Sequence, residues 1–425
     1  MDTPGRINVE IACTKGFCKE RPAPDLQQAI RQYIADVKTL PKDHVFQVCY
    51  PNVDSVMICD RITESTPRNN LCVITYLLRD ETGEEETIEQ DGDEIQIANH
   101  WMLPAREFHG MWESLIYDEC LKDDLMSFMQ TTMLFSRKNV NPNLIACNRL
   151  ILLHGPPGTG KTSLCKALAQ KLSIRMQAHY KHAHLIEINS HSLFSKWFSE
   201  SGKLVQKVFG QIHELCQDQS SLVCVLVDEV ESIAFARESI SNNEPSDSIR
   251  VVNAVLTQLD RIRKYPNVFV LATSNLTGRI DLAFLDRADI VQFIGNPSLP
   301  AIYQIYRTAL DDLQSAGVIT VEDFVPAYEE ATEMSVVASN LKSVANLSVG
   351  LSGRSLRKVP FLAHALFVQQ EETTMLKFLG AMRNAVRRMR RDKEMLETKH
   401  QPKQSSDSNG VSSENATAEG TDNGQ

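Results

Sequence analysis

The sequence predicts an α/β protein in which a mainly parallel sheet is preceded by a small α+β domain and followed by a helical subdomain. Between residues 101 and 297, apolar strand-like runs alternate with helical patterns, which is typical of βαβ units. From 298 to 399 the pattern is helical only. A chain of 425 residues has room for two or three such units.

Residues 1–100 form the predicted α+β domain. An alternating strand begins at Ile7, and apolar residues at helical spacing extend from Asp25 to Lys38. Three strand-like runs follow, at residues 45–49, 56–59 and 71–78. The acidic stretch from Asp80 to Glu94 is typical of a solvated hairpin or loop. Because no catalytic constellation occurs in this segment, we expect it to bind a substrate or an adaptor.

Four apolar runs define the strands of the α/β domain, at residues 150–153, 185–188, 223–227 and 268–272. Continuous apolar runs of this kind are typical of parallel strands that are covered by helices on both faces. Beyond residue 399 the chain is rich in Ser, Asn, Gly, Glu and Thr and almost free of apolar residues. Residues 400–425 are therefore predicted to be a disordered tail.

The composition favours a reduced, soluble protein of the cell interior. The formal net charge of −10 argues against a phosphate backbone as the main surface partner. The ten cysteines include no CxxC pair, and no matching His/Cys cluster completes a zinc site. No signal peptide and no run of about 18 apolar residues is present, so we expect no membrane span.

The clearest motif is a glycine-rich segment that follows the strand-like run 150–153. It matches GxxxxGK[ST] and consists of Gly155, Pro156, Pro157, Gly158, Thr159, Gly160, Lys161 and Thr162. A helix is predicted to begin near Thr162, so the backbone N–H groups and the helix N-terminus would together bind phosphate. Lys161 is expected to reach the β- and γ-phosphates, and Thr162 to help coordinate Mg²⁺. The sequence therefore predicts an ATP and Mg²⁺ site.

Two carboxylates end another predicted buried strand. Asp228 and Glu229 follow the apolar run 223–227, and the carboxyl ends of parallel strands face the ligand crevice of an open α/β sheet. We expect Asp228 to help hold the Mg²⁺. Glu229 would orient and activate the water that attacks the γ-phosphate, which favours hydrolysis over nucleotide binding alone.

Three further polar residues are candidates for the same site. Asn275 follows the strand-like run 268–272 and would bind the attacking water or the γ-phosphate; the alternative is a turn-forming Asn. Arg287 is a candidate arginine finger for the neighbouring subunit, or else pairs locally with Asp286 or Asp289. Arg354 opens a predicted lid helix and would reach the γ-phosphate; the alternative is a surface arginine.

These motifs resemble those of AAA+ ATPases, and more closely those of the pachytene checkpoint protein 2 family. The discriminating segments lie within about residues 101–368 and are Leu103-Pro104, Gly110–Tyr117, Gly155–Thr162, Lys196–Lys203, Asp286–Ile290, Gly350–Arg354 and Pro360–Leu366. The resemblance implies an AAA+ phosphate-loop core with a helical lid. It also implies a ring-shaped homo-hexamer with ATP at the subunit interfaces.

The resemblance further implies what the ATPase acts on. The implied substrates are HORMA-domain proteins of the spindle checkpoint and of meiotic chromosome axes, which would be converted from closed to open form, with a HORMA-domain adaptor as a further partner. Such work implies the nucleus, on chromosomes, as well as the cytoplasm. No direct nucleic-acid partner and no membrane partner is expected.

Lys196, Trp197 and Phe198 are the candidate substrate-gripping residues. They lie between the second core strand and the next predicted helix. Around the pore of a ring, such aromatic side chains would hold an extended polypeptide through apolar contact without selecting its sequence. The alternative is a hydrophobic staple packed on the following helix.

Two other functions share the same ATP site. A nucleic-acid motor or clamp-loader-like ATPase is favoured only by the basic run 387–391, which is also typical of a solvated helix face. A scaffold that uses ATP only for assembly is the third hypothesis.

Overall fold

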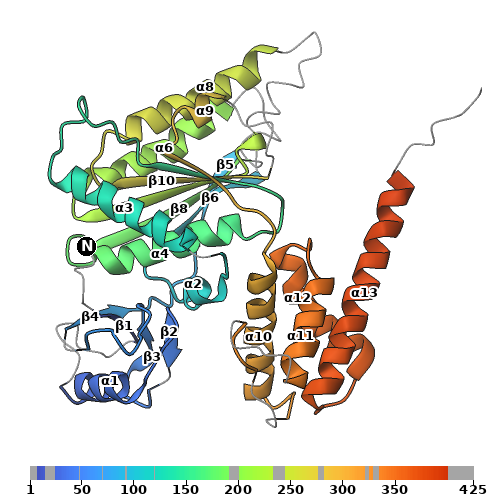
Figure 1. Ribbon diagram of the computed structural model, residues 1–425. Coiled ribbons are helices and arrows are strands. Elements are labelled where there is room, and N and C mark those ends of the chain that lie inside the picture. The colour runs from blue at the N-terminus through green and yellow to red at the C-terminus, as the bar shows by residue number, and fades with distance from the viewer. Residues whose placement is uncertain are drawn as a thin grey trace, which may run out of the picture.

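The computed structural model describes residues 7–14, 24–46, 48–68, 70–90, 93–118, 120–190, 201–232, 245–275, 282–320, 325–328 and 335–400. It confirms the predicted fold class, because an N-terminal α+β domain, a helix-covered sheet and a helical lid follow one another along the chain (Figure 1). Residues 401–425 of the predicted tail fall outside the described residues, so the tail stays a prediction. Within the described residues, no helix combines the length and the apolar character needed to cross a bilayer.

The N-terminal domain is a four-stranded sheet with one helix. Its strand order is β2-β3-β1-β4, and its elements are β1 (Ile7–Cys13), α1 (Pro24–Asp36), β2 (His44–Phe46), β3 (Val53–Ile58) and β4 (Leu71–Leu77). β1 pairs with β3 in antiparallel and with β4 in parallel orientation. The odd-numbered side chains of β1 pack against Leu26, Ile30 and Ile34 of α1. The even-numbered side chains therefore point to the opposite face.

The central sheet has seven strands in the order β11-β7-β10-β9-β8-β6-β5. They are β5 (Glu84–Gln90), β6 (Asp93–Met102), β7 (Leu150–His154), β8 (His182–Asn189), β9 (Ser221–Asp228), β10 (Val268–Ser274) and β11 (Ile290–Phe293). The strands from β11 to β8 are parallel, whereas β6 is antiparallel to β8 and to β5. The sheet is thus mainly parallel, as predicted.

The predicted domain boundary near residue 100 is corrected by this topology. It falls inside β6, and the acidic hairpin β5–β6 belongs to the central sheet rather than to the N-terminal domain. The physical reason is that β6 forms an antiparallel ladder with β8 and buries Ala98 and Trp101 in the two cores of the central domain. The boundary therefore lies between β4 and β5.

Helices cover both faces of the central sheet. α3 (Leu121–Arg137) and α4 (Lys161–Met176) pack on one face, and α6 (Ser201–Gln217) and α8 (Pro245–Ile262) on the other. Three short elements complete the domain, namely η1 (Arg106–Phe108), α2 (Met111–Ser114) and α9 (Leu282–Leu285). Because both faces are covered, β9 and β10 are buried along almost their whole length and only their ends meet the ligand crevice.

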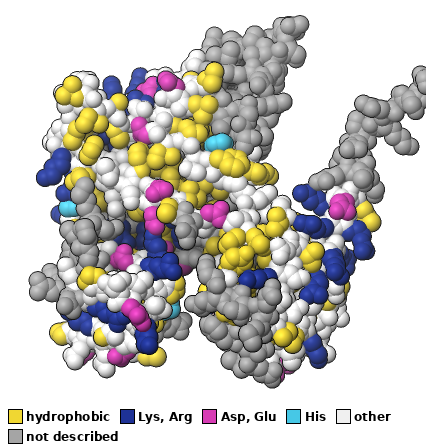
Figure 2. Space-filling model, viewed as in Figure 1, with side chains coloured by type: hydrophobic (Ala, Val, Ile, Leu, Met, Phe, Trp, Pro, Cys, Tyr) yellow, Lys and Arg dark blue, Asp and Glu magenta, His cyan; other side chains and the backbone are white. Residues whose placement is uncertain are grey.

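The lid has its own core. It contains α10 (Leu299–Ser315), α11 (Val336–Leu347), α12 (Gly353–Ala363), the π-helical turn η2 (His364–Val368) and the long α13 (Met375–His400). Ser298, Ser335 and Ser352 cap the first three of these helices. Lys and Arg side chains gather along α13 (Figure 2), where Arg387 and Arg388 are exposed.

A buried ion cluster joins the N-terminal domain to α4. Glu10 of β1 is fully buried, and its two carboxylate oxygens lie 2.7 Å from Lys171 Nζ and 2.6 Å from Arg175 Nε. Burial raises the pKa of Glu10, but the two cations outweigh burial and hold it below its ordinary value. The alternation in β1 predicts a half-exposed strand; in the structure its polar face is covered by α4, because these cations neutralise Glu10.

Candidate active site

The phosphate loop connects β7 to α4, as the motif requires. Gly158 and Gly160 have φ angles of 79° and 92°, the left-handed region that favours glycine. A Cβ on Gly160 would lie 2.7 Å from the Tyr117 hydroxyl, so this position has no room for a side chain. A glycine-rich loop of this conformation directly before the N-terminus of α4 fits the binding of an anion.

Lys161 is placed inside this loop. Its Nζ donates to the carbonyls of Gly155 and Pro156 at 2.9 and 2.8 Å, and the residue is only 4% exposed. Burial lowers the pKa of Lys161, while Glu231 and Asp228 oppose the effect. A buried cation whose partners are mainly neutral carbonyls fits a site that receives the negative charge of phosphate.

Thr162 and Asp228 meet across the loop, as predicted for an Mg²⁺ site. The Thr162 hydroxyl donates to the Asp228 carboxylate at 2.8 Å, and the Thr273 hydroxyl donates to the same carboxylate oxygen. A hydroxyl and a carboxylate beside a phosphate-binding loop are the oxygen ligands that Mg²⁺ uses in nucleotide sites. These residues therefore fit Mg²⁺ held jointly by protein and phosphate.

Glu229 stands at a sharp turn just after β9. Its φ of 56° is unusual for a residue with a side chain, and its backbone N–H donates to the Thr273 hydroxyl at 3.2 Å. The Asn275 side-chain amide donates to the Glu229 carboxylate at 3.3 Å. Asn275 is thus beside Glu229 at the ends of neighbouring strands, and it is not a simple turn residue.

Glu231 was not predicted as a site residue. One of its oxygens accepts from the backbone N–H of Asn275 at 3.0 Å, and the other has no hydrogen-bond partner among the described residues although it is buried. Glu231 therefore holds the backbone beside Asn275. Thr273 was missed as well. Both lie within two residues of a predicted site residue, at the ends of β9 and β10, which is the signal that could have found them.

The lid closes directly over the phosphate loop. The backbone N–H of Arg354 donates to the Gly158 carbonyl at 3.0 Å, and a Cβ on Gly158 would come within 3.0 Å of the Ser352 hydroxyl. The Arg354 charge lowers the pKa of Lys161, so the guanidinium lies near the phosphate-binding point. The N-termini of α4 and α12 therefore face the same place.

Residues 114–118 contact both the phosphate loop and the lid, and no site role was predicted for them. The Tyr117 hydroxyl donates to the Thr159 and Gly160 carbonyls at 3.3 and 3.2 Å. Ile116 packs against the lid core, and Asp118 accepts from Ser298 at the start of α10. This segment therefore links the phosphate loop to the lid through side-chain contacts.

Arg287 pairs with Asp260, a partner that was not predicted from the sequence. Its Nε and Nη2 donate to the two oxygens of Asp260 at 3.0 and 2.9 Å, in a bidentate pair between the end of α9 and α8. The hydrogen bonds from Arg287 lower the pKa of Asp260. The pair with Asp260 could not be predicted, because the sequence does not show that α8 lies beside α9. The arginine-finger role stays a prediction.

Lys196, Trp197 and Phe198 lie outside the described residues. Residues 191–200 separate β8 from α6, so the segment follows the carboxyl end of a central strand. Their role as pore residues stays a prediction.

The fold and this site define the chain as an AAA ATPase, which confirms the predicted enzyme class. Residues 151–296 match the ATPase family associated with various cellular activities, and residues 298–390 match the TRIP13-like AAA+ ATPase lid C-terminal domain. A pachytene checkpoint protein 2 homolog of Danio rerio is 51% identical over 359 residues, which are 81% of this chain and 84% of that protein. The chain therefore belongs to the pachytene checkpoint protein 2 family.

Two solved structures extend the comparison. The structure of C. elegans PCH-2 matches with a TM-score of 0.74 at 36% identity, and the match covers 91% of this chain and 99% of the other. A chain in the structure of an E. coli MS115-1 HORMA:CdnC:Trip13 complex matches with a TM-score of 0.51 at 17% identity, over 68% of this chain and 94% of that one. The second similarity concerns the fold alone.

Proposed function

We propose that this ATPase works as a homo-hexamer that uses Mg-ATP to pull on HORMA-domain proteins and convert them from closed to open form. The observation that carries the hydrolytic part is the contact between Asn275 and Glu229 opposite the phosphate loop. Family membership supports the substrate class, as does the fold shared with a chain from a solved HORMA:CdnC:Trip13 complex. Roles in meiotic chromosome axes and the spindle checkpoint, in nucleus and cytoplasm, belong to the same proposal.

The chain supplies most of the groups that hydrolysis needs. The loop amides, Lys161 and Arg354 bind the phosphates of ATP, and Thr162 and Asp228 hold Mg²⁺, which neutralises charge on the phosphate oxygens when bound. Glu229 orients the attacking water and accepts its proton, and Asn275 fixes the position of the Glu229 carboxylate. Positioning and charge stabilisation account for most of the catalysis in this kind of reaction.

The remaining group is supplied by a second subunit. Transition states of phosphoryl transfer are stabilised by an additional arginine, and in this chain Arg287 is bound to Asp260 rather than to the described phosphate-binding residues. In a ring, Arg287 of one subunit would face the nucleotide of the next. Hydrolysis would then depend on subunit contacts.

Movement follows from the link between the lid and the loop. The hydrogen bond from Arg354 to Gly158 and the contacts of residues 114–118 hold the lid in one orientation relative to the central domain. Loss of the γ-phosphate removes contacts that hold this relation, so the lid and the next subunit shift together. Lys196, Trp197 and Phe198 would transmit the shift to an extended segment of the substrate.

The decisive experiment measures phosphate release with and without a purified HORMA-domain protein, together with the fraction of that protein in the open form. We expect a higher ATPase rate and conversion to the open form, both requiring ATP hydrolysis. ATPase stimulation by DNA but not by the HORMA protein would support the nucleic-acid motor instead. Normal assembly without any phosphate release would support the scaffold.

A further inference from the structure

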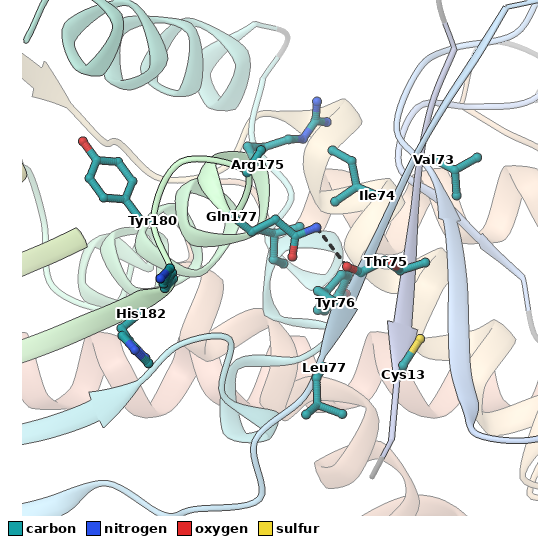
Figure 3. A pocket seen from close by; sticks show the side chains of 13 residues that line it. Cys13, Val73, Ile74, Thr75, Tyr76, Leu77, Arg175, Gln177, Tyr180 and His182 are labelled. Carbon is teal, nitrogen blue, oxygen red and sulfur yellow. Dashed lines mark hydrogen bonds between the residues drawn. The ribbon is translucent and has the colours of Figure 1, made fainter. Parts of the chain in front are cut away.

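A cavity of about 760 Å³ opens where the N-terminal domain meets the central domain (Figure 3). β4 forms one wall, and the end of α4 with the residues leading into β8 forms the other. The only side-chain bond drawn across it runs from Gln177 to the Thr75 carbonyl, at 2.9 Å. The cavity is distinct from the nucleotide site, which lies at the opposite end of α4.

The β4 wall is a free sheet edge. β4 is the last strand of its sheet, and in the described part of the chain no further strand pairs with its outer side. The parallel register with β1 is framed by bonds from Ile7 N–H to the Asn70 carbonyl and from Leu78 N–H to the Cys13 carbonyl. This pattern turns the backbone groups of even-numbered β4 residues toward β1.

The odd-numbered residues consequently present their N–H and C=O groups to the cavity. Those that line the cavity are Val73, Thr75 and Leu77, and the bond from Gln177 to the Thr75 carbonyl agrees with this orientation. Edge strands of seven residues are usually protected by charges, prolines, bulges or a covering segment. β4 contains no proline and no charged residue. An edge of this kind accepts an additional strand.

The residues around this edge indicate which side chains an added strand would carry. Tyr76 and Ile174 form a buried apolar floor. Three basic residues, Arg175, Lys181 and His182, line the cavity, and among its described lining residues there is no Asp or Glu. Glu10 compensates Arg175, whereas Lys181 and His182 are exposed at the rim. Lys181 therefore supplies a positive charge at the rim, although the chain as a whole is acidic.

We propose that the outer edge of β4 binds an extended, acidic peptide segment of a partner protein by strand addition. Backbone hydrogen bonds to Val73, Thr75 and Leu77 would supply the affinity, and acidic side chains would face Lys181 and His182. A strand opposite the seven residues of β4 is about 20 Å long. The inference goes beyond the proposed function, because binding at this edge requires neither ATP hydrolysis nor a HORMA fold.

The test uses fluorescence anisotropy with the full-length protein and a labelled, blocked ten-residue peptide that alternates Val and Glu. One control is the same peptide with Lys in place of Glu. Two further controls are N-methylated at alternate residues, one in each register, so that each lacks the N–H donors of one edge. Thr75→Pro removes an outward N–H while the bonds to β1 remain. Lys181→Glu reverses a rim charge, and Lys377→Glu on the lid is its matched control.

We expect the Val-Glu peptide to bind, with slower hydrogen exchange of the β4 amides. N-methylation on the donating edge, Thr75→Pro and Lys181→Glu should each raise the Kd at least about tenfold, since each removes one or two polar contacts. Two controls test whether the charge at the rim matters. Lys377→Glu should leave the Kd of the Val-Glu peptide unchanged, and the Val-Lys peptide should bind weakly. No binding at about 1 mM peptide, or equal binding of both N-methylated registers and the parent peptide, would overturn the proposal. Because the methylated peptides are tested on the unchanged protein, misfolding of a variant cannot produce that result.

Discussion

The side-chain amide of Asn275 donates to a carboxylate oxygen of Glu229 across 3.3 Å, so residues at two neighbouring strand ends fix the carboxylate that we propose to be catalytic. The backbone N–H of Glu229 donates to Thr273, and the backbone N–H of Asn275 donates to Glu231. The carboxylate position is thus set by reciprocal bonds between β9 and β10. The proposed chemistry of the Glu229 carboxylate and the contacts that position it involve different residues, so each can be tested by its own substitution.

Replacing Glu229 by Gln should abolish turnover but not ATP binding. The amide has nearly the shape of the carboxylate, but it cannot accept a proton from water, so we expect kcat to fall about 10²–10⁴-fold. Phosphate release measures turnover, and a fluorescent ATP analogue measures affinity. A variant that hydrolyses ATP at the wild-type rate would show that Glu229 is not the catalytic carboxylate.

Glu231 should act on kcat through Asn275. Glu231→Gln keeps an acceptor for the Asn275 N–H, so activity should be retained within a few-fold, whereas Glu231→Leu leaves that N–H unsatisfied and should lower kcat about tenfold or more. The KM for ATP should change little in both variants, because no phosphate contact is lost. Equal kcat values for the two variants would remove the positioning role.

Mixed rings test Arg287. Arg287→Ala should lower kcat by about 10³-fold if the residue is an arginine finger. Mixing Arg287→Ala chains with Glu229→Gln chains should restore part of the activity, because some interfaces then combine an intact Glu229 with an intact Arg287. Asp260→Asn is the structural control: if it reproduces the loss and mixing restores nothing, Arg287 serves only the ion pair with Asp260.

Neutralising Glu10 should loosen the N-terminal domain. Glu10→Gln leaves Lys171 and Arg175 buried without a counter-charge, a change that costs roughly 3–5 kcal/mol of unfolding free energy. Because folding lowers the Glu10 pKa, its contribution is complete above the ordinary value of 4.5 and is lost as the pH falls through the folded value. Denaturant unfolding from pH 7 to pH 3 should show this acid-dependent part in the wild type and its absence in Glu10→Gln. If the unfolding free energy depends on pH equally in the wild type and in Glu10→Gln, Glu10 does not stabilise the fold through its ion pairs.

Trp197 should affect remodelling without affecting basal hydrolysis. Trp197→Ala removes the aromatic surface, whereas Trp197→Phe preserves an aromatic ring for apolar contact. We expect Trp197→Ala to hydrolyse ATP at the basal rate and to leave a HORMA-domain protein closed, and Trp197→Phe to open it. If Trp197→Ala converts the HORMA-domain protein fully to the open form, Trp197 does not bind the substrate during remodelling.

Local patterns were sufficient to predict which residues lie together at the phosphate loop. The phosphate loop, Asp228 and Glu229 each follow an apolar run, and the parallel sheet brings such strand ends together without further information. Glu231 and Thr273 escaped prediction because their roles depend on which strands are neighbours. The arginine-finger role of Arg287 remains a prediction because it requires a neighbouring subunit, and the role of Trp197 remains one because this residue lies outside the described residues.

The amino-acid sequence by itself determined the fold class, the order of the domains and the residues that meet at the phosphate loop, because hydrophobic period and glycine placement are local properties. Only the tertiary structure decided that the β5–β6 hairpin joins the central sheet, that Arg287 pairs with Asp260, and that the polar face of β1 is buried. Each of these depends on a partner distant in the chain. Glu10 shows the reason: its neighbours in β1 suggest solvent, but Lys171 and Arg175, more than 160 residues away in α4, make its burial stable.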